Sequence, residues 1–414
     1  LYIPFQLLNL KSIFDLVKIK HLFYTRVMDV LEKIKLTSLN LPFEAAEDVG
    51  YPQSSSNGPD DLAGLKERFP VTHAHLPNGR TIPLLKTMQT SGCERDCNYC
   101  CFRAGRDTPR ASLTPDELAS AVVKLTRAGI AKGLFLSSGL AGSGVRTQDK
   151  LIATTEILRH KYHYHEYIHL KIMPGSERDQ IFRAMQLADR ISINLEGANE
   201  SSLSKLAPHK IFFEELLRPL QIIEDIRQSA PPHLAWKRTW PTSCTQFVVG
   251  AVGESDLDLL QTTHQLQVQL KITRAYYSNF SPVSETPFEH LPPSNPWRQH
   301  RLYQAFFLLR DYQFDFEELP FSSTGNLSLE KDPKLLWAEA HLRHKPIEVN
   351  TADYAQLLKI PGIGAISAKK IIQNRGYGKI RDIQTLSNMG ISTSRASPFI
   401  LLDGWRPAYQ PSLF

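Results

Sequence analysis

Short apolar runs alternate with longer amphipathic segments through the middle of the chain. The runs have the length of β-strands, and most neighbours are separated by enough residues for a helix. The runs are Ile82–Met88, Gly133–Ser137, Ile168–Met173, Arg190–Leu195, Thr245–Val249 and Ala275–Phe280. Strands that alternate with helices predict a parallel sheet, so the pattern indicates an α/β protein with a partial (β/α)6 barrel.

Two helix starts in this region are well marked. Thr114-Pro115-Asp116-Glu117 is a capping box with proline at the first helical position, and it predicts a helix that runs to about Ala128. The proline-rich break at residues 292–296 introduces a second helix, from Trp297 to about Tyr312. We expect this helix to be the last one of the barrel domain.

The pattern changes after residue 321. Residues 322–345 read as a linker with a short helix around Pro333–Leu342, and residues 346–406 contain no further strand candidate. Short helices joined by glycine turns predict a small all-α domain there. Its sequence echoes itself, because Leu357-Leu358 before Pro361-Gly362-Ile363-Gly364 recurs as Leu386 before Met389-Gly390-Ile391-Ser392.

The remaining segments are a tail, 407–414, and an N-terminal extension, 1–60, before a barrel domain that we place at 61–321. Residues 1–27 are apolar and basic, but Lys11, Asp15, Lys18 and Lys20 interrupt the apolar runs, so the segment makes a poor signal peptide. The chain begins with Leu, and Met28 looks like a natural start. We therefore expect residues 1–27 to be upstream sequence or a frayed extension that is not part of the native protein. No apolar run predicts a membrane span.

Composition and cysteine distribution indicate the cellular compartment of the protein. The 42% of hydrophobic residues is ordinary for a protein with a large core. The net charge of +6 permits a polyanionic partner without requiring one. Four of the five cysteines lie between residues 93 and 101, which suits a metal or cluster site in a reducing compartment better than a set of disulfides. We expect a cytoplasmic protein.

The cysteines Cys93, Cys97 and Cys100 lie just past the first predicted strand, where barrel enzymes place their chemistry. Three thiolates at C-x3-C-x2-C spacing can hold three corners of a cubane cluster and leave one iron without a protein ligand. The alternative is a zinc site completed by Cys101 or by a distant histidine. We favour the cluster, because no second zinc-binding pair is evident, and we expect Cys101 to be a packed small residue.

This spacing, with the aromatic Tyr99 before the third cysteine, resembles the radical S-adenosylmethionine (SAM) superfamily. The resemblance implies a [4Fe-4S] cluster on Cys93, Cys97 and Cys100, SAM on the open iron, and a 5′-deoxyadenosyl radical. It also implies cofactor-binding positions, at Tyr99 and after the later strands. Glu196 could instead be a solvated residue at a helix start, and Gly250 could serve only a turn. These positions are Tyr99, Ser138, Gly139, Glu196 and Gly250.

Other candidate side chains carry weaker signals. Cys244 could meet substrate in the barrel mouth, although a lone cysteine is more often a buried hydrophobic residue. Four nearby histidines do not share one helical or strand face, and we expect them to lie on a solvated surface rather than to bind a metal. They are His160, His163, His165 and His169.

The C-terminal domain resembles a helix-hairpin-helix. Asn350-Thr351 can cap a helix that ends near Lys359, and the Pro361–Gly364 turn leads into a second helix. Glycines let backbone N–H groups approach a DNA phosphate, and lysines neutralise its neighbours, so such binding ignores base sequence. The predicted DNA-binding residues are Gly362, Ile363, Gly364, Lys369 and Lys370.

The charge of this domain supports the hypothesis. The segment from Lys345 to Arg406 contains nine basic residues and four acidic ones. The second hairpin has Met389 and Ser392 in place of proline and glycine, and we expect it to bind phosphate less well. The alternative for the whole domain is a module for protein interaction.

Together the two parts resemble the bacterial family of DNA modification/repair radical SAM proteins. The resemblance implies an enzyme that binds the DNA backbone nonspecifically, works with an electron donor and a uracil-DNA-glycosylase-like partner, and acts on an extruded nucleotide. Two alternatives stay open: a tRNA-modifying radical SAM enzyme, and a non-enzymatic DNA-binding protein whose cluster senses redox state. The sequence identifies no substrate-side acid, base or radical relay.

Overall fold

The computed structural model describes residues 29–38, 71–75 and 81–408. The predictions for residues 1–27, and for most of the extension to residue 60, lie outside them. The chain divides into two compact units, each described by itself. The first holds residues 1–95, 101–192 and 225–242, and the second holds residues 96–100, 193–224 and 243–414. No helix among the described residues is long and apolar enough to cross a membrane.

All six predicted strands form, and the sheet order follows the chain. The strands are β2 (Thr81–Met88), β3 (Gly133–Ser137), β4 (Tyr167–Lys171), β5 (Arg190–Ser192), β6 (Thr242–Val249) and β7 (Arg274–Asn279). Pairing is parallel from β2 to β5 and between β6 and β7. The fold is therefore the predicted α/β partial barrel. Sequence analysis missed one strand, β1 (Val71–His75), which pairs antiparallel with β2.

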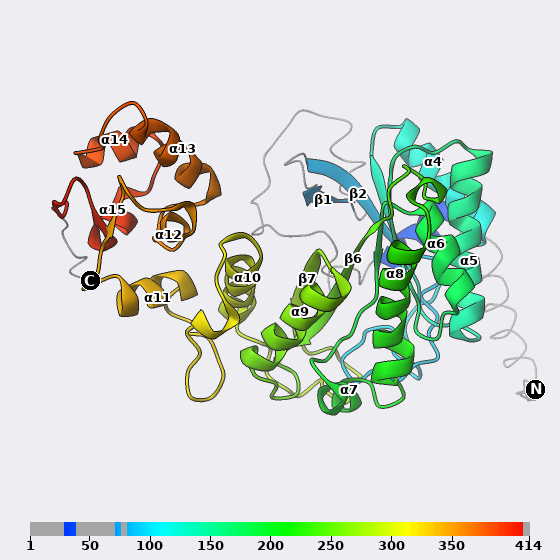
Figure 1. The fold of residues 1–414 in the computed structure, drawn as a ribbon. Helices are drawn as coiled ribbons and strands as arrows, with labels where there is room; N and C mark the ends of the chain where they lie inside the picture. The colour runs from blue at the N-terminus through cyan, green and yellow to red at the C-terminus, as the bar shows by residue number, and fades with distance from the viewer. Residues whose placement is uncertain (1–28, 39–70, 76–80, 409–414) are drawn as a thin grey trace, which may run out of the picture. The chain divides into compact units, whose positions relative to one another are not determined.

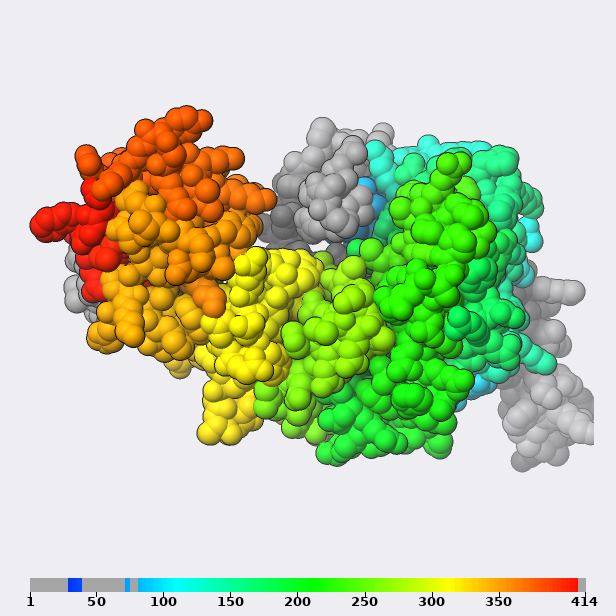
Figure 2. Space-filling view, in the orientation of Figure 1, coloured from blue at the N-terminus to red at the C-terminus, as the bar shows by residue number. Residues whose placement is uncertain are grey.

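Helices cover one face of the sheet in the first unit (Figure 1). The side chains on that face, such as Leu134, Ile168 and Ile191, are fully buried and aliphatic. Burial of this apolar area stabilises the α/β packing. Helix α5 packs against both α4 and α6, and Figure 2 shows side chains of this unit, in cyan to green, on its outer surface. The helices and turns of this unit are α2 (Val30–Ser38), α4 (Pro115–Arg127), α5 (Gly144–Glu156), η2 (Ile157–Lys161), α6 (Arg178–Leu187) and η4 (Pro232–Leu234).

Aromatic packing holds the outer face of β7 in the second unit. The Tyr277 ring lies 5.3 Å from Tyr303 and 6.5 Å from Phe306, both on α10. The Tyr303 hydroxyl accepts a hydrogen bond from the Tyr277 backbone N–H. The elements of this part are α7 (Glu200–Leu206), η3 (Phe212–Leu217), α9 (Asp256–Leu270), α10 (Pro296–Asp311) and η5 (Phe316–Glu318), and α8 (Arg218–Ser229) extends from it into the first unit.

The C-terminal segment is helical, as predicted. Its elements, coloured from orange-yellow to red in Figure 1, are α11 (Pro333–His341), α12 (Tyr354–Leu358), α13 (Ala365–Arg375), α14 (Ile383–Asn388), α15 (Thr393–Ala396) and η6 (Ser397–Phe399). Two-residue strands, β8 (Ile347–Glu348) and β9 (Ile400–Leu401), pair in parallel, which the sequence pattern did not indicate.

One predicted cap in this segment is wrong. Asp353, rather than Asn350-Thr351, caps α12, because its carboxylate accepts the Gln356 N–H at 2.7 Å. Asn350 instead bonds to the backbone of Ile380, and so joins two segments of the domain.

The Thr114 capping box forms as predicted, so its removal should weaken the first unit. Thr114 Oγ1 accepts the Glu117 N–H at 3.2 Å, and the Glu117 carboxylate accepts the Thr114 N–H at 2.8 Å. We expect Thr114→Ala to lower the free energy of unfolding by about 1 kcal/mol in urea unfolding followed by circular dichroism. Thr114→Ser keeps the acceptor and is the matched control. Equal losses from the two variants would show that the cap does not stabilise the unit.

Candidate functional site

The loop after β2 carries the three cysteines of the predicted site. Cys93 belongs to the first unit, whereas Cys97 and Cys100 belong to the second. Each half of the loop is therefore described with its own neighbours. All the cysteines are free thiols in the structure.

The end of β3 lies directly against the Cys93 segment. The Gly139 N–H donates to the Thr90 carbonyl at 2.7 Å, and the Leu140 N–H points to Cys93 Sγ at 3.4 Å. A Cβ on Gly139 would lie 2.2 Å from the Gly92 carbonyl oxygen. Glycine is therefore the residue that lets the two backbones meet here.

Ser138 lies at the same strand end and is buried. Its hydroxyl donates to the Gly139 carbonyl at 2.7 Å. Gly139 is thus adjacent to Cys93, and the contact of Ser138 and Gly139 with a cofactor stays a prediction.

The turn that carries Cys97 and Cys100 is tied to the end of α7. The Asn98 backbone N–H donates to the Leu206 carbonyl at 2.8 Å, and its side-chain amide donates to the Lys205 carbonyl, also at 2.8 Å. Asp96 and His209 form a further contact of 2.6 Å. These bonds fix the position of the turn relative to α7 and the segment after it.

Glu196 lies beside this turn in a strained backbone conformation. Its φ is +64°, which is unfavourable for a residue with a side chain, and such strain is typical of functional sites. Its backbone pairs with β6 through Gln246 and Val248. Glu196 is only 6% exposed, and α7 begins later, at Glu200, so the alternative of a solvated helix-start residue is excluded.

Tyr99 packs against an apolar cluster formed by Leu206, Val248 and Phe280. Its hydroxyl hydrogen-bonds to the Glu196 carboxylate. Burial, and then the negative charge of Glu196, raise the pKa of Tyr99 well above its usual range, so the phenol keeps its proton.

Lys210 is the charged residue of this site that sequence analysis missed. Its ammonium lies 3.1 Å from Glu196 Oε1, and the two side chains are 11% and 7% exposed. Burial lowers the pKa of Lys210, but Cys97 and then Glu196 outweigh it, so that its pKa lies above the usual range and the side chain is a cation. No motif or spacing in the sequence connects Lys210 with the cysteines.

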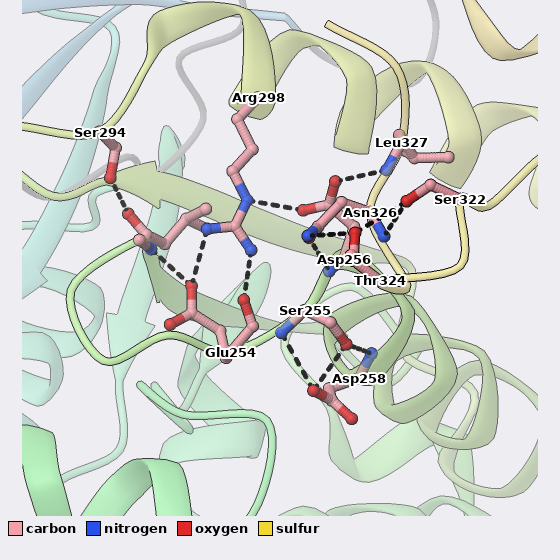
Figure 3. A network of polar contacts seen from close by, with 12 residues as sticks. Glu254, Ser255, Asp256, Asp258, Ser294, Arg298, Ser322, Thr324, Asn326 and Leu327 are labelled. Carbon is pink, nitrogen blue, oxygen red and sulfur yellow. Dashed lines mark hydrogen bonds and ion pairs between the residues drawn. The ribbon is translucent and has the colours of Figure 1, made fainter.

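The loop after β6 is organised by the buried charges of Glu254, Asp256 and Arg298 (Figure 3). The predicted Gly250 belongs to this loop. Its N–H donates to the Glu254 carboxylate, which also lies 3.3 Å from Arg298 Nη1. Arg298 Nε donates to Asp256 at 2.7 Å, and Asp256 accepts the Leu327 N–H at 2.9 Å.

Gly250 itself has a local structural reason to be glycine. Its φ is +92°, and a Cβ would lie 2.0 Å from Ser294 Oγ. The structure therefore accounts for the glycine through the turn and the close approach of Ser294, and its contact with the cofactor stays a prediction.

Cys101, Cys244 and the four histidines have ordinary surroundings. Cys101 and Cys244 are both buried. His169 is also buried, contrary to the expected solvated position, and hydrogen-bonds to Ser192 at 2.8 Å. Within the described ranges no three histidine, cysteine or acidic side chains are placed to bind one metal ion.

The first hairpin turn has the geometry that its glycines predict. Gly362 has a φ of +84°, and a Cβ there would lie 2.6 Å from the Ser392 carbonyl oxygen of the second hairpin. Gly364 is the N-cap of α13 and provides no side-chain cap. The Ile363 side chain is buried, its carbonyl accepts a bond from Lys334 Nζ at 2.6 Å, and its N–H donates to the Ile360 carbonyl at 3.1 Å. The polar groups of Ile363 are thus used within the domain, and its contact with DNA stays a prediction.

The predicted DNA-binding lysines differ in their surroundings. Lys369 is exposed on α13. Lys370 Nζ donates to the Met389 carbonyl at 2.9 Å and so joins the two hairpins. Other basic side chains also have intramolecular partners: Lys359 with Glu318, Arg375 with the Val349 and Ala352 carbonyls, Lys379 and Arg381 with Asp403, Arg395 with Asp332, and Arg406 with the Arg343 carbonyl.

Comparison with known protein families identifies both parts of the chain. Residues 88–264 match the radical SAM superfamily, and residues 343–394 match a helix-hairpin-helix motif. The chain thus contains a radical SAM domain followed by a motif that suggests nucleic-acid binding. Proteins of the radical SAM superfamily use a [4Fe-4S] cluster and SAM as cofactors, and residues 88–264 of this chain form a domain of that superfamily.

Several solved structures are similar to this chain. Methylornithine synthase (PylB) has a TM-score of 0.42 at 13% identity over 55% of this chain and 61% of that one. The [FeFe]-hydrogenase maturase HydG from Carboxydothermus hydrogenoformans has a TM-score of 0.42 at 13% identity over 55% and 51%. The protein anSMEcpe with bound AdoMet has a TM-score of 0.38 at 12% identity over 56% and 58%. The matches therefore cover less than two thirds of each of these chains. No curated protein matches.

The residues present fit the two cofactors. Cys93 has a backbone N–H directed at its sulfur, and hydrogen bonds to cluster sulfurs are a normal feature of such sites. Cys97 and Cys100 have the Lys210 cation in their electrostatic environment, which compensates the charge of thiolate ligands. Glu196 offers a buried carboxylate for an ammonium or a ribose hydroxyl.

We expect substitutions of the three ligand cysteines and of Cys101 to differ in their effect on cluster content. Cys93→Ser, Cys97→Ser and Cys100→Ser should each lose most of the iron and sulfide after anaerobic reconstitution, because each removes one cluster corner. Cys101→Ser, the adjacent matched control, should retain both. The measurement is iron and sulfide content together with the visible absorption of the cluster. Loss of the cluster from Cys101→Ser, or full loading of Cys97→Ser, would contradict the ligand assignment.

Proposed function

We propose that this protein is a radical SAM enzyme that acts on DNA, in modification or repair. The observation that carries the proposal is the presence in one chain of a radical SAM domain, at residues 88–264, and a helix-hairpin-helix motif, at residues 343–394. The first part supplies the chemistry, and the second supplies an affinity for a phosphate backbone.

The N-terminus of α13 is the proposed phosphate contact. The helix has eleven residues, and its N-cap, Gly364, leaves the N–H groups of the first turn without a side-chain cap. Such a terminus carries partial positive charge and suits a phosphate. The nearby exposed Lys369 adds a full positive charge. Because phosphates are the same at every base pair, this binding is independent of sequence.

The second hairpin contributes less to DNA binding in this proposal. Its second helix, α15, has only four residues. The peptide dipoles of so short a helix add little, and Ser392 makes no capping bond through its side chain. Its Met389 carbonyl is held by Lys370, which stabilises the pair of hairpins.

In the radical SAM domain we assign the cluster to Cys93, Cys97 and Cys100. The bound cluster and SAM supply a 5′-deoxyadenosyl radical. We assign the binding of SAM to Tyr99 and to the other predicted positions, with Glu196 accepting hydrogen bonds from the cofactor. These positions are Ser138, Gly139, Glu196 and Gly250. The apolar packing of Tyr99 helps to exclude water from a site where a reactive radical would otherwise be lost.

The substrate in this proposal is a nucleotide that leaves the base stack, because an atom inside a duplex is not accessible to an enzyme pocket. The enzyme needs a one-electron donor for its cluster. The family resemblance adds a uracil-DNA-glycosylase-like protein as a partner on the same DNA.

Mass spectrometry tests the reaction directly. Reconstituted, reduced enzyme is incubated with SAM deuterated at the 5′ carbon and with duplex DNA, single-stranded DNA or folded tRNA. We expect 5′-deoxyadenosine together with a nucleoside of altered mass or deuterium content from DNA. Activity on tRNA alone would replace the proposal with a tRNA-modifying enzyme. Absence of 5′-deoxyadenosine in every case would favour a redox-sensing protein.

Lys369 provides a test of the DNA-binding surface. We expect Lys369→Ala to weaken binding to duplexes of different sequence equally, and to reduce the slope of log K against log salt by about 1, since one phosphate contact is lost. Fluorescence anisotropy over a salt series measures both quantities. Lys124→Ala, which removes an exposed lysine from α4 of the radical SAM domain, is the matched control. An identical salt dependence for both variants and the wild type would contradict the role of Lys369.

A further inference from the structure

Lys210 and Glu196 form an ion pair, and no cluster or cofactor motif in the sequence accounts for Lys210. Their side chains lie 3.1 Å apart and are almost fully buried. Burying two charges costs desolvation energy, so a buried ion pair adds little to stability by itself. Removing one partner is strongly destabilising, because the other charge is then buried without compensation. The position of the pair, beside the turn with Cys97 and Cys100, indicates what its function is.

The segment after α7 is held against the cysteine turn by several independent bonds. Asn98 donates to the Leu206 and Lys205 carbonyls, and Asp96 contacts His209. The Lys210 N–H donates to the Ala207 carbonyl at 3.0 Å, which closes the short loop that carries the lysine. The lysine is therefore fixed near the cysteines by the backbone as well as by its own ion pair.

Glu196 receives bonds from two directions. The Lys210 ammonium donates to its carboxylate. The hydroxyl of Tyr99, which precedes Cys100 in the chain, donates to it as well. The strained backbone of Glu196 is held by its pairing with β6. The carboxylate is thus a fixed anchor for the ammonium.

We propose that the Lys210–Glu196 pair sets the reduction potential of the cluster. The Lys210 cation stabilises the reduced state, and Glu196 both holds the cation in place and offsets part of its charge. Reduction adds one electron from an external donor to the cluster and makes it more negative by one charge. A fixed positive charge nearby favours that change, and a negative charge opposes it, more strongly in a buried site than in water. Lys210 and Glu196 are positioning residues in this role.

Two single variants and their combination test the proposal. Reconstituted protein without SAM or DNA is titrated anaerobically with dithionite in the presence of redox mediators, and the reduced cluster is measured by electron paramagnetic resonance. We expect Lys210→Met to shift the midpoint potential to a more negative value, because the Glu196 charge is left alone. Glu196→Gln should shift it to a more positive value. The double variant should lie between the two, close to the wild type.

Conservative and distant substitutions serve as controls. Lys210→Arg keeps the charge and should retain most of the wild-type potential. Lys205→Met removes an exposed lysine from α7, the helix that precedes the Lys210 loop, and should leave the potential nearly unchanged, because solvent screens its charge. Iron and sulfide content confirms that each variant holds its cluster.

The direction of the shifts decides the outcome. Shifts of the same sign for Lys210→Met and Glu196→Gln, or no shift in either, would overturn the proposal. If Lys210→Met fails to hold a cluster, Glu196→Gln decides by itself, since a more positive potential supports the proposal and any other result overturns it. The titration contains no nucleic acid, so its result is independent of whether the enzyme acts on DNA.

Discussion

The structure depends on how the turn with Cys97 and Cys100 is held close to a buried cation. Thiolates are strongly negative when they act as ligands, and burial of uncompensated charge is among the most costly events in folding. Lys210 supplies the opposite charge, Glu196 fixes Lys210, and Tyr99 joins Glu196 to the cysteine turn. The hydrogen bonds of Asn98 add a backbone contact that keeps the arrangement in register. A local sequence of cysteines thus becomes a site only when a segment far along the chain closes on it.

The same principle limits what the positive charge of the C-terminal domain can do. Most of its basic side chains are used within the chain, as when Arg375 donates to backbone carbonyls or Lys379 pairs with Asp403. A net charge counted along the sequence therefore overstates the number of cations that face a ligand. The backbone N–H groups at the start of α13 and the exposed Lys369 are groups that the fold leaves near the first hairpin for phosphates.

Much of the fold could be predicted because its signals are local. The six parallel strands follow from short apolar runs, and the Thr114 capping box from four consecutive residues. The cysteine motif is equally local. Strand β1 was missed because its pattern, with two histidines in five residues, is polar for a strand. The α12 cap was misplaced because Asn350 and Asp353 are both good capping residues, and tertiary bonds to Ile380 draw Asn350 elsewhere. Lys210 could not be predicted, because only the fold brings its segment to the cysteine turn. The adjacent His209 and its partner Asp96 are 113 positions apart in the chain.

A division of labour follows from the two kinds of contact that the chain offers. The hairpin contacts that we propose are made to phosphates, which every duplex presents alike, so they raise the local concentration of DNA without choosing a target. Selection then has to occur where an individual base can be recognised, in the domain that carries the radical chemistry. Since an extruded base costs less to obtain where pairing is already weak, damaged or mismatched positions would reach that domain more often than intact ones. Selectivity in such an enzyme comes from the state of the DNA as well as from the pocket, and the nonspecific tail is compatible with both.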